Sequence, residues 1–123
     1  MSTVKKLMIV DDEETLTFSL YQTFIMAKQD YEVITAASGE EAVQKLADGR
    51  FDLVITDISM PGMTGLDLLA QIRLHYPQTE VIVMTAYGSD DKKEEALKIG
   101  ARYYIEKPFE IKEIKQLVMD LLN

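Results

Sequence analysis

Short apolar runs alternate with helical segments along the chain, and this alternation constrains the fold more than any other feature. Runs with the length of buried strands lie at residues 7–10, 31–36, 53–55, 81–84 and 103–105. Segments with apolar residues at helical spacing lie between these runs and after the last one. Strands that alternate strictly with helices are typical of α/β domains with helices on both faces of a parallel sheet. We therefore expect one domain over residues 1–123, with five strands and five helices.

Capping and breaking residues place the helix ends. A capping box, in which two side chains satisfy free main-chain amides, is expected at residues 38–41 and again at 64–67. Gly49 is expected to end the first of these helices, and Pro77 the second. The helix at about residues 90–99 offers only Ala96, Leu97 and Ile99 to a core, so we expect it to be the most loosely packed.

The composition narrows the classes of partner. With 13 basic and 21 acidic residues the net charge is −8, which disfavours direct binding to nucleic acid or to an anionic membrane surface. The chain has no cysteine, so disulfides and thiolate metal sites are excluded. No apolar run approaches the length of a signal peptide core or a membrane span, so a soluble, cytoplasmic protein is the default expectation.

Polar side chains follow four of the expected strands. Asp11 and Asp12 come directly after the first strand, Asp57 after the third, Thr85 after the fourth and Lys107 after the fifth. In an open parallel sheet the functional crevice lies outside the carboxyl ends of the strands. If the first and third strands are neighbours, as in the flavodoxin-like order, the three carboxylates converge there.

Each of these residues also has an ordinary interpretation. Asp57 before a turn can be a solvated or capping residue, Asp11 and Asp12 can be acids that favour a helix N-terminus, and Thr85 and Lys107 can be plain strand residues. Together they indicate a different chemistry. Converging carboxylates without Cys or His favour Mg²⁺, and a metal, a lysine and a hydroxyl can neutralise a phosphoryl group on an aspartate nucleophile.

The chain resembles the receiver domains of two-component response regulators, from about Lys5 to Leu122. The resemblance rests on four motifs in order: "IVDDEE", "VITDISMPGMTG", "VMTAYG" and "YYIEKPF". The chain is similar in particular to single-domain receivers of sporulation relays and to the receivers of enhancer-binding regulators. The resemblance implies a flavodoxin-like (CheY-like) domain with strand order 2-1-3-4-5. It also implies a cis peptide bond at Lys107-Pro108.

The resemblance also assigns roles within the site. Asp57 would accept a phosphoryl group from a phosphohistidine. Mg²⁺, or Mn²⁺ in its place, would be held by Asp12, Asp57 and the main-chain carbonyl of Ser59, with Asp11 in support. Lys107 would contact the phosphoryl oxygens.

Two further residues would form the switch that reads out phosphorylation. The Thr85 hydroxyl would hydrogen-bond the phosphoryl group, and Tyr104 would be the aromatic residue that rotates in response. Tyr103 and Tyr104 would lie on opposite faces of a strand, with one packed and the other partly exposed. Met60 and Met63 flank the site and could line a surface for a partner. His75 is expected at the surface near a helix end.

The partners implied are a histidine kinase or histidine phosphotransfer protein and an output domain or downstream protein, with phosphorylation-linked dimerisation allowed for. The chain is expected to be a single-domain or excised receiver that catalyses only its own phosphorylation and dephosphorylation. A rival interpretation is a small Mg²⁺-dependent phosphohydrolase with an aspartate nucleophile, but Ser59 stands where such enzymes usually carry a second acid. A flavin-binding protein is disfavoured because four acids follow the first strand and would repel the flavin phosphate.

Overall fold

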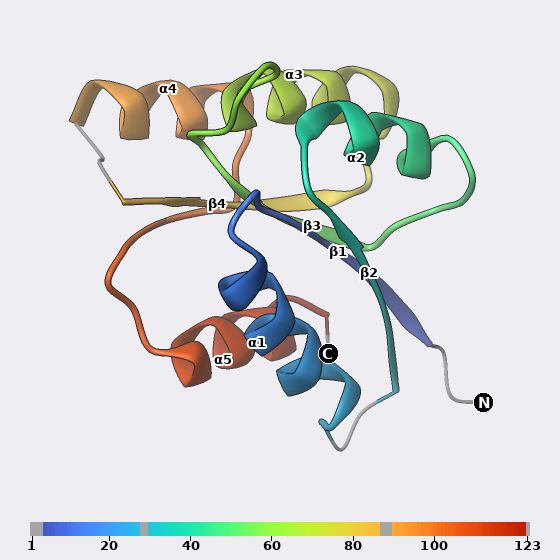
Figure 1. Cartoon of the computed structure of the whole chain (residues 1–123). Helices are drawn as coiled ribbons and strands as arrows, with labels where there is room; N and C mark the ends of the chain where they lie inside the picture. Colours follow the sequence, from blue (N-terminus) through green and yellow to red (C-terminus); the bar gives the residue numbers. More distant parts are fainter. Residues whose placement is uncertain (1–3, 28–29, 87–89, 123) are drawn as a thin grey trace.

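The computed structural model describes residues 4–27, 30–86 and 90–122. Over these residues the chain forms alternating strands and helices (Figure 1). Their bounds in chain order are β1 Lys5–Val10, α1 Glu14–Ile25, β2 Tyr31–Ala36, α2 Gly39–Leu46, β3 Leu53–Asp57, α3 Gly65–His75, β4 Glu80–Thr85, α4 Asp90–Ile99, β5 Tyr103–Glu106 and α5 Ile111–Leu122. The prediction of five strands and five helices is confirmed within the described residues.

The strands form one parallel sheet in the order β2-β1-β3-β4-β5. This order confirms the flavodoxin-like topology, with β1 and β3 as neighbours at the centre. Val10 at the end of β1 lies opposite Thr56 in β3. Asp11, which follows Val10, and Asp57, which follows Thr56, therefore lie side by side at one edge of the sheet.

Helices cover both faces of the sheet (Figure 1). On one face α2, α3 and α4 pack on strand residues such as Met8, Val54 and Val83. On the other face α1 and α5 pack on the alternate strand residues, among them Leu7 and Ile55. Because both faces are buried, the strands read as continuous apolar runs rather than as alternating patterns.

The predicted helix signals are confirmed at the start of α3, but both signals predicted for α2 differ from the structure. At residues 64–67 the capping box is complete, because Thr64 and Asp67 exchange both hydrogen bonds. At the start of α2 only half of a box forms: the Ser38 hydroxyl accepts from the Glu41 amide, while the Glu41 carboxylate accepts from the amide of Ala37. The helix α2 ends at Leu46 rather than at Gly49. A short-range bond from the Asp48 amide to the Lys45 carbonyl, three residues back, tightens the chain before the glycine.

The helix α4 buries few apolar side chains, as predicted, but the prediction for one of its expected core residues is wrong. Ala96 is fully buried and Ile99 packs against the core, whereas Leu97 is 44% exposed. Positions 96 and 99 share one face of a helix, and position 97 is rotated about 100° away from it. No helix of the described residues is long and apolar enough to cross a bilayer.

Candidate functional site

Three carboxylates meet at the carboxyl edge of the central strands. Asp57 is the last residue of β3, and Asp11 follows β1 directly. A carboxylate oxygen of each of Asp11, Asp12 and Asp57 lies within 4.8 Å of the others. Asp11 and Asp57 are buried, and Asp12 is exposed. The predicted convergence of the three carboxylates is confirmed, and it follows from the pairing of β1 with β3.

Lys107 brings a positive charge to the two buried carboxylates. Its Nζ lies 3.3 Å from Oδ2 of Asp57 and 3.4 Å from Oδ2 of Asp11. The main chain holds the lysine in register with the sheet, because the Lys107 amide donates to the Thr85 carbonyl at 2.7 Å. One ammonium group therefore compensates two carboxylates that both come from the centre of the sheet.

The electrostatics of this group follow from burial and from shared charge. Burial raises the pKa of the Asp11 carboxyl above its ordinary value, and the negative charge of Asp57 raises it further, against the lowering effects of the Glu13 amide and Lys107. Burial acts to lower the pKa of the Lys107 ammonium, but the charges of Asp11 and Asp57 outweigh it and the pKa is raised. The lysine therefore stays charged, whereas the ionised form of Asp11 is disfavoured by its burial and by the nearby charge of Asp57.

Main-chain amides orient the two buried carboxylates. The Glu13 amide donates to Oδ1 of Asp11 at 2.9 Å, and the Ser59 amide donates to Oδ1 of Asp57 at 3.2 Å. Each carboxylate thus has one oxygen bonded to the segment that follows it and the other directed at Lys107. The amide of Ser59 is therefore at the site, whereas the role expected of its carbonyl stays a prediction.

The two predicted switch residues lie on the adjacent strands. Thr85 is fully buried at the end of β4. Tyr103 and Tyr104 pack against opposite cores, as predicted, but both are partly buried rather than one packed and one partly exposed. The reason is that α4 covers the Tyr104 side of the sheet and α5 the Tyr103 side. The hydroxyl oxygen of Tyr104 is shielded from solvent. Their roles in readout stay predictions.

Other predicted features are partly confirmed. The Lys107-Pro108 peptide bond is cis. His75 is exposed at the end of α3, as expected. The suggestion that Met60 could line a surface for a partner is wrong, because this residue is 7% exposed and belongs to the core under α2 and α3. Met63 is only partly buried.

Sequence reasoning missed the role of Gly65 in supporting the phosphoacceptor candidate. A Cβ at this position would overlap the main-chain carbonyl oxygen of Asp57. The Gly65 amide also donates to the Ile58 carbonyl at 2.8 Å. Only glycine lets α3 begin this close to the end of β3. A glycine at the start of a capping-box helix was the available signal, since Thr64 and Asp67 already predicted the helix start.

The donor set fits a hard divalent cation. Every candidate ligand in the cluster is a carboxylate oxygen, and Asp12 is open to solvent, so water can complete the coordination. One lysine does not balance three carboxylates, which leaves a net negative charge for a cation to offset. Mg²⁺ binds at sites of this kind through one or two carboxylates and retains several waters.

Comparisons with known proteins agree with this geometry. A family model described as the response regulator receiver domain matches residues 7–119. Sporulation initiation phosphotransferase F of Bacillus subtilis is 36% identical over 118 residues, which are 96% of this chain and 94% of that protein. The response regulator protein FleR of Pseudomonas aeruginosa is 41% identical over 113 residues, which are 92% of this chain and 24% of FleR. The chain thus spans about a quarter of that relative.

Solved structures lead to the same family. The chemotaxis response regulator CheY4 of Vibrio cholerae superposes with a TM-score of 0.89 at 33% identity, covering 98% of this chain and all of that one. Neither rival interpretation, the phosphohydrolase or the flavin-binding protein, is favoured by these matches. Because the family model covers residues 7–119 and a relative aligns with 96% of the chain, the chain belongs to the receiver domains of two-component response regulators.

Proposed function

We propose that Asp57 accepts a phosphoryl group from a phosphohistidine of a histidine kinase or a histidine phosphotransfer protein. The observation that carries this proposal is the pairing of Asp57 with Lys107 beside Asp11 and Asp12. In the reaction an Asp57 carboxylate oxygen attacks phosphorus, the phosphorus–nitrogen bond of the donor breaks, and the imidazole leaves with the bonding pair. Lys107 offsets the charge on the transferred group.

The acid cluster supports a role for a bound metal. We assign Asp12, Asp57 and the Ser59 carbonyl as ligands of Mg²⁺, or of Mn²⁺ in its place, with Asp11 in support. When bound, the cation neutralises the acceptor carboxylate and the incoming phosphoryl oxygens. The protein itself holds the acceptor in place, through the Ser59 amide on one oxygen and Lys107 on the other.

Readout of phosphorylation is assigned to Thr85 and Tyr104. Thr85 ends β4 next to Asp57 in β3, since Asp57 lies opposite Met84 in the ladder. Its hydroxyl would bond the phosphoryl group, and Tyr104 of the neighbouring strand would adjust its position in response. A two-state element of this kind converts a local change in charge into a change of surface.

The wider assignment follows from the family. Residues 1–123 act as one receiver domain that serves as a signalling element, catalyses only its own phosphorylation and dephosphorylation, and controls an output domain or a downstream protein. Dimerisation linked to phosphorylation fits this role. The net charge of −8 argues against direct contact of this chain with nucleic acid or membrane. A cytoplasmic location fits a partner that is a kinase or a phosphotransfer protein.

A small acyl phosphate tests the proposal without a partner protein. Incubation with Mg²⁺ should add the mass of one phosphoryl group to the parent, and hydroxylamine should remove it. Asp57→Asn, or EDTA, should abolish the addition. Phosphorylation that survives either treatment would refute the assignment, and sustained release of phosphate from added phosphate esters would favour the phosphohydrolase.

A further inference from the structure

Three hydrogen bonds from main-chain amides hold the segment of residues 58–64, between β3 and α3. At its start the Ser59 amide donates to Oδ1 of Asp57 at 3.2 Å. At its end the Gly65 amide donates to the Ile58 carbonyl at 2.8 Å. Near its end the Met63 amide also donates to Oε2 of Glu40 at 3.0 Å. The last contact comes from a different element, 23 residues earlier in the chain.

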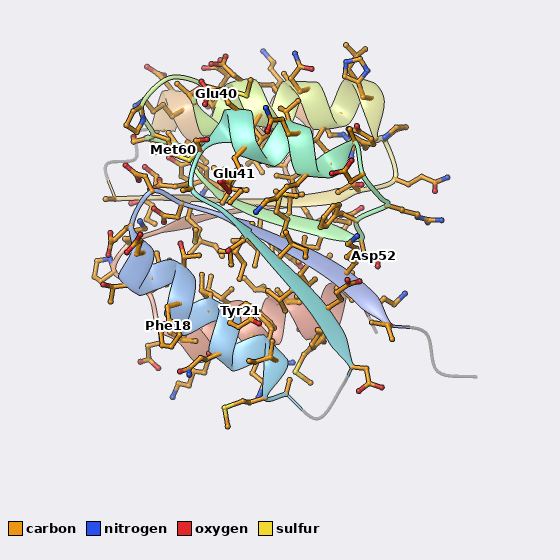
Figure 2. All side chains as sticks on the ribbon, turned by 45° about the vertical axis from the view of Figure 1, so that its right-hand side comes forward. Phe18, Tyr21, Glu40, Glu41, Asp52 and Met60 are labelled. Atoms are coloured by element: carbon orange, nitrogen blue, oxygen red, sulfur yellow. The ribbon has the colours of Figure 1, made fainter. Side chains whose placement is uncertain are left out.

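Glu40 lies in the first turn of α2, yet its carboxylate bonds this segment. The neighbouring Glu41 acts within its own region, since it accepts from the Ala37 amide and pairs with Lys45 at 3.3 Å. Two adjacent glutamates at the start of one helix therefore have different partners. Figure 2 shows that Glu40 of α2 and Met60, which belongs to the 58–64 segment, lie on the same side of the sheet.

The fit between α2 and the segment is tight as well as hydrogen-bonded. Gly62 has a φ of 77°, and a Cβ there would lie 2.5 Å from Oε2 of Glu40. A Cβ at Gly39 would lie 2.9 Å from Cβ of Met63. Glycines at both positions let the start of α2 approach the segment closely enough for the Glu40 carboxylate to reach an amide.

We propose that Glu40 is a positioning residue for the acceptor. By bonding Met63 it fixes the 58–64 segment, and the segment in turn presents the Ser59 amide to Asp57. This inference rests on the proposed function, because the benefit of a fixed Ser59 is an oriented Asp57 and a Ser59 carbonyl held ready for the cation. Groups that orient the direct ligands of a site commonly affect its affinity.

Three variants separate the hydrogen bond from the charge. Glu40→Ala removes the acceptor, and Glu40→Gln keeps an acceptor oxygen while it removes the charge. Glu113→Ala is the matched control, because Glu113 is also an exposed acid in the first turn of a helix, and it has no side-chain bond among the described residues. Amide exchange at Ser59 and Met63, Mg²⁺ affinity by calorimetry and the melting temperature are measured for each.

In Glu40→Ala we expect amide exchange at Ser59 and Met63 to be about fivefold faster and Mg²⁺ affinity about fivefold weaker, the size of one modest hydrogen bond. Glu40→Gln should stay within about twofold of the parent, and Glu113→Ala should match the parent. The proposal is overturned if Glu40→Ala matches Glu113→Ala at both amides. It is also overturned if Glu40→Gln is as impaired as Glu40→Ala, or if exchange rises evenly across the chain.

The outcome is separable from that of the proposed function. If Asp57 of the parent accepts no phosphoryl group, the proposed function fails, whereas exchange at Ser59 and Met63 still decides whether Glu40 positions the segment. If the parent is phosphorylated and the exchange is unchanged in Glu40→Ala, only the inference about Glu40 fails.

Discussion

Asp11 and Asp57 share the single ammonium group of Lys107, so the ionised carboxylate of Asp11 lowers the stability of the folded protein. Both carboxylates are buried, and Lys107 lies at almost the same distance from each. Asp57 ends β3 and is supported by the residues that follow it, with the Ser59 amide on its carboxylate and Gly65 packed against its main-chain carbonyl. The pKa of Asp11 is raised because burial and the charge of Asp57 both disfavour its ionised form. Such strain is typical of sites where function and stability compete.

Asp11→Asn should therefore stabilise the metal-free protein at neutral pH, by about 0.5–2 kcal/mol. The amide keeps an oxygen for the Glu13 amide and removes the like charge beside Asp57. Because folding raises the pKa of Asp11, keeping this carboxyl ionised lowers the free energy of unfolding of the parent at pH values above the raised pKa. As the pH falls, Asp11 is protonated in the native state before it is protonated in the unfolded chain. The destabilisation therefore decreases below the raised pKa and disappears near the ordinary pKa of 3.8.

Urea unfolding of the parent and Asp11→Asn in EDTA, from pH 7 down to pH 4, measures this difference. The gap between the two proteins should be widest at pH 7 and should narrow as the pH falls. A variant that is less stable than the parent at pH 7, or a gap that widens toward pH 4, would show that Asp11 is not under electrostatic strain.

At the scale of elements, α4 differs from the other helices in how little it buries. Ala96 is its only fully buried residue among residues 90–99, and it lies on the side of the sheet where Tyr104 packs. An element held by few apolar contacts opens or shifts at low cost. This helix is therefore the element that a change at Thr85 and Tyr104 moves most readily.

Beryllofluoride, a phosphoryl mimic, should change amide exchange in residues 90–106 of the parent by about threefold or more. The change should be confined to α4, β5 and their connection, because β5 pairs with β4 at Thr85 and α4 packs on β5. Thr85→Ala should still bind the mimic but should lose most of this change. The measurement is amide exchange by mass spectrometry, with residues 31–36 of β2 as the internal reference. An unchanged parent, or a variant that responds as the parent does, would place the switch elsewhere.

At the scale of the whole molecule, binding of a cation at one edge should stabilise the entire fold. Asp57 lies far along the chain from the adjacent Asp11 and Asp12, and the three carboxylates meet only in the folded state, so the cation has little affinity for the unfolded chain. A ligand at 100 times its dissociation constant then adds about 2.7 kcal/mol to the free energy of unfolding. For a domain of this size that corresponds to a rise in Tm of roughly 10 °C.

A thermal melt with and without Mg²⁺ tests this linkage, with Asp12→Ala as the comparison. The parent should show the rise in Tm, and Asp12→Ala should show little of it while being at least as stable without metal, because a like charge is gone. An equal response to Mg²⁺ in both proteins would mean that Asp12 is not a ligand. Glu113→Ala, which removes an acid far from the cluster in sequence, controls for the loss of one negative charge.

The amino-acid sequence by itself determined the order and type of the elements. Apolar runs long enough for buried strands, the Thr64 and Asp67 capping box and the break at Pro77 are local signals, and local signals survive because they do not depend on distant partners. The sequence also placed Asp11, Asp12, Asp57, Thr85 and Lys107 at strand ends. Gly49 and Leu97 were misjudged, because a tight turn ends α2 early and the rotation of α4 leaves Leu97 outside.

Only the tertiary structure decided which groups touch. The pairing of β1 with β3 brings the carboxylates within 4.8 Å of one another. The β4–β5 ladder and the bond from the Lys107 amide to the Thr85 carbonyl bring Lys107 to them. The bond from Met63 to Glu40 has no local signal, because it joins atoms of two segments that pack together only after folding. Contacts of this kind depend on the packing of whole elements, which a pattern along the chain does not encode residue by residue.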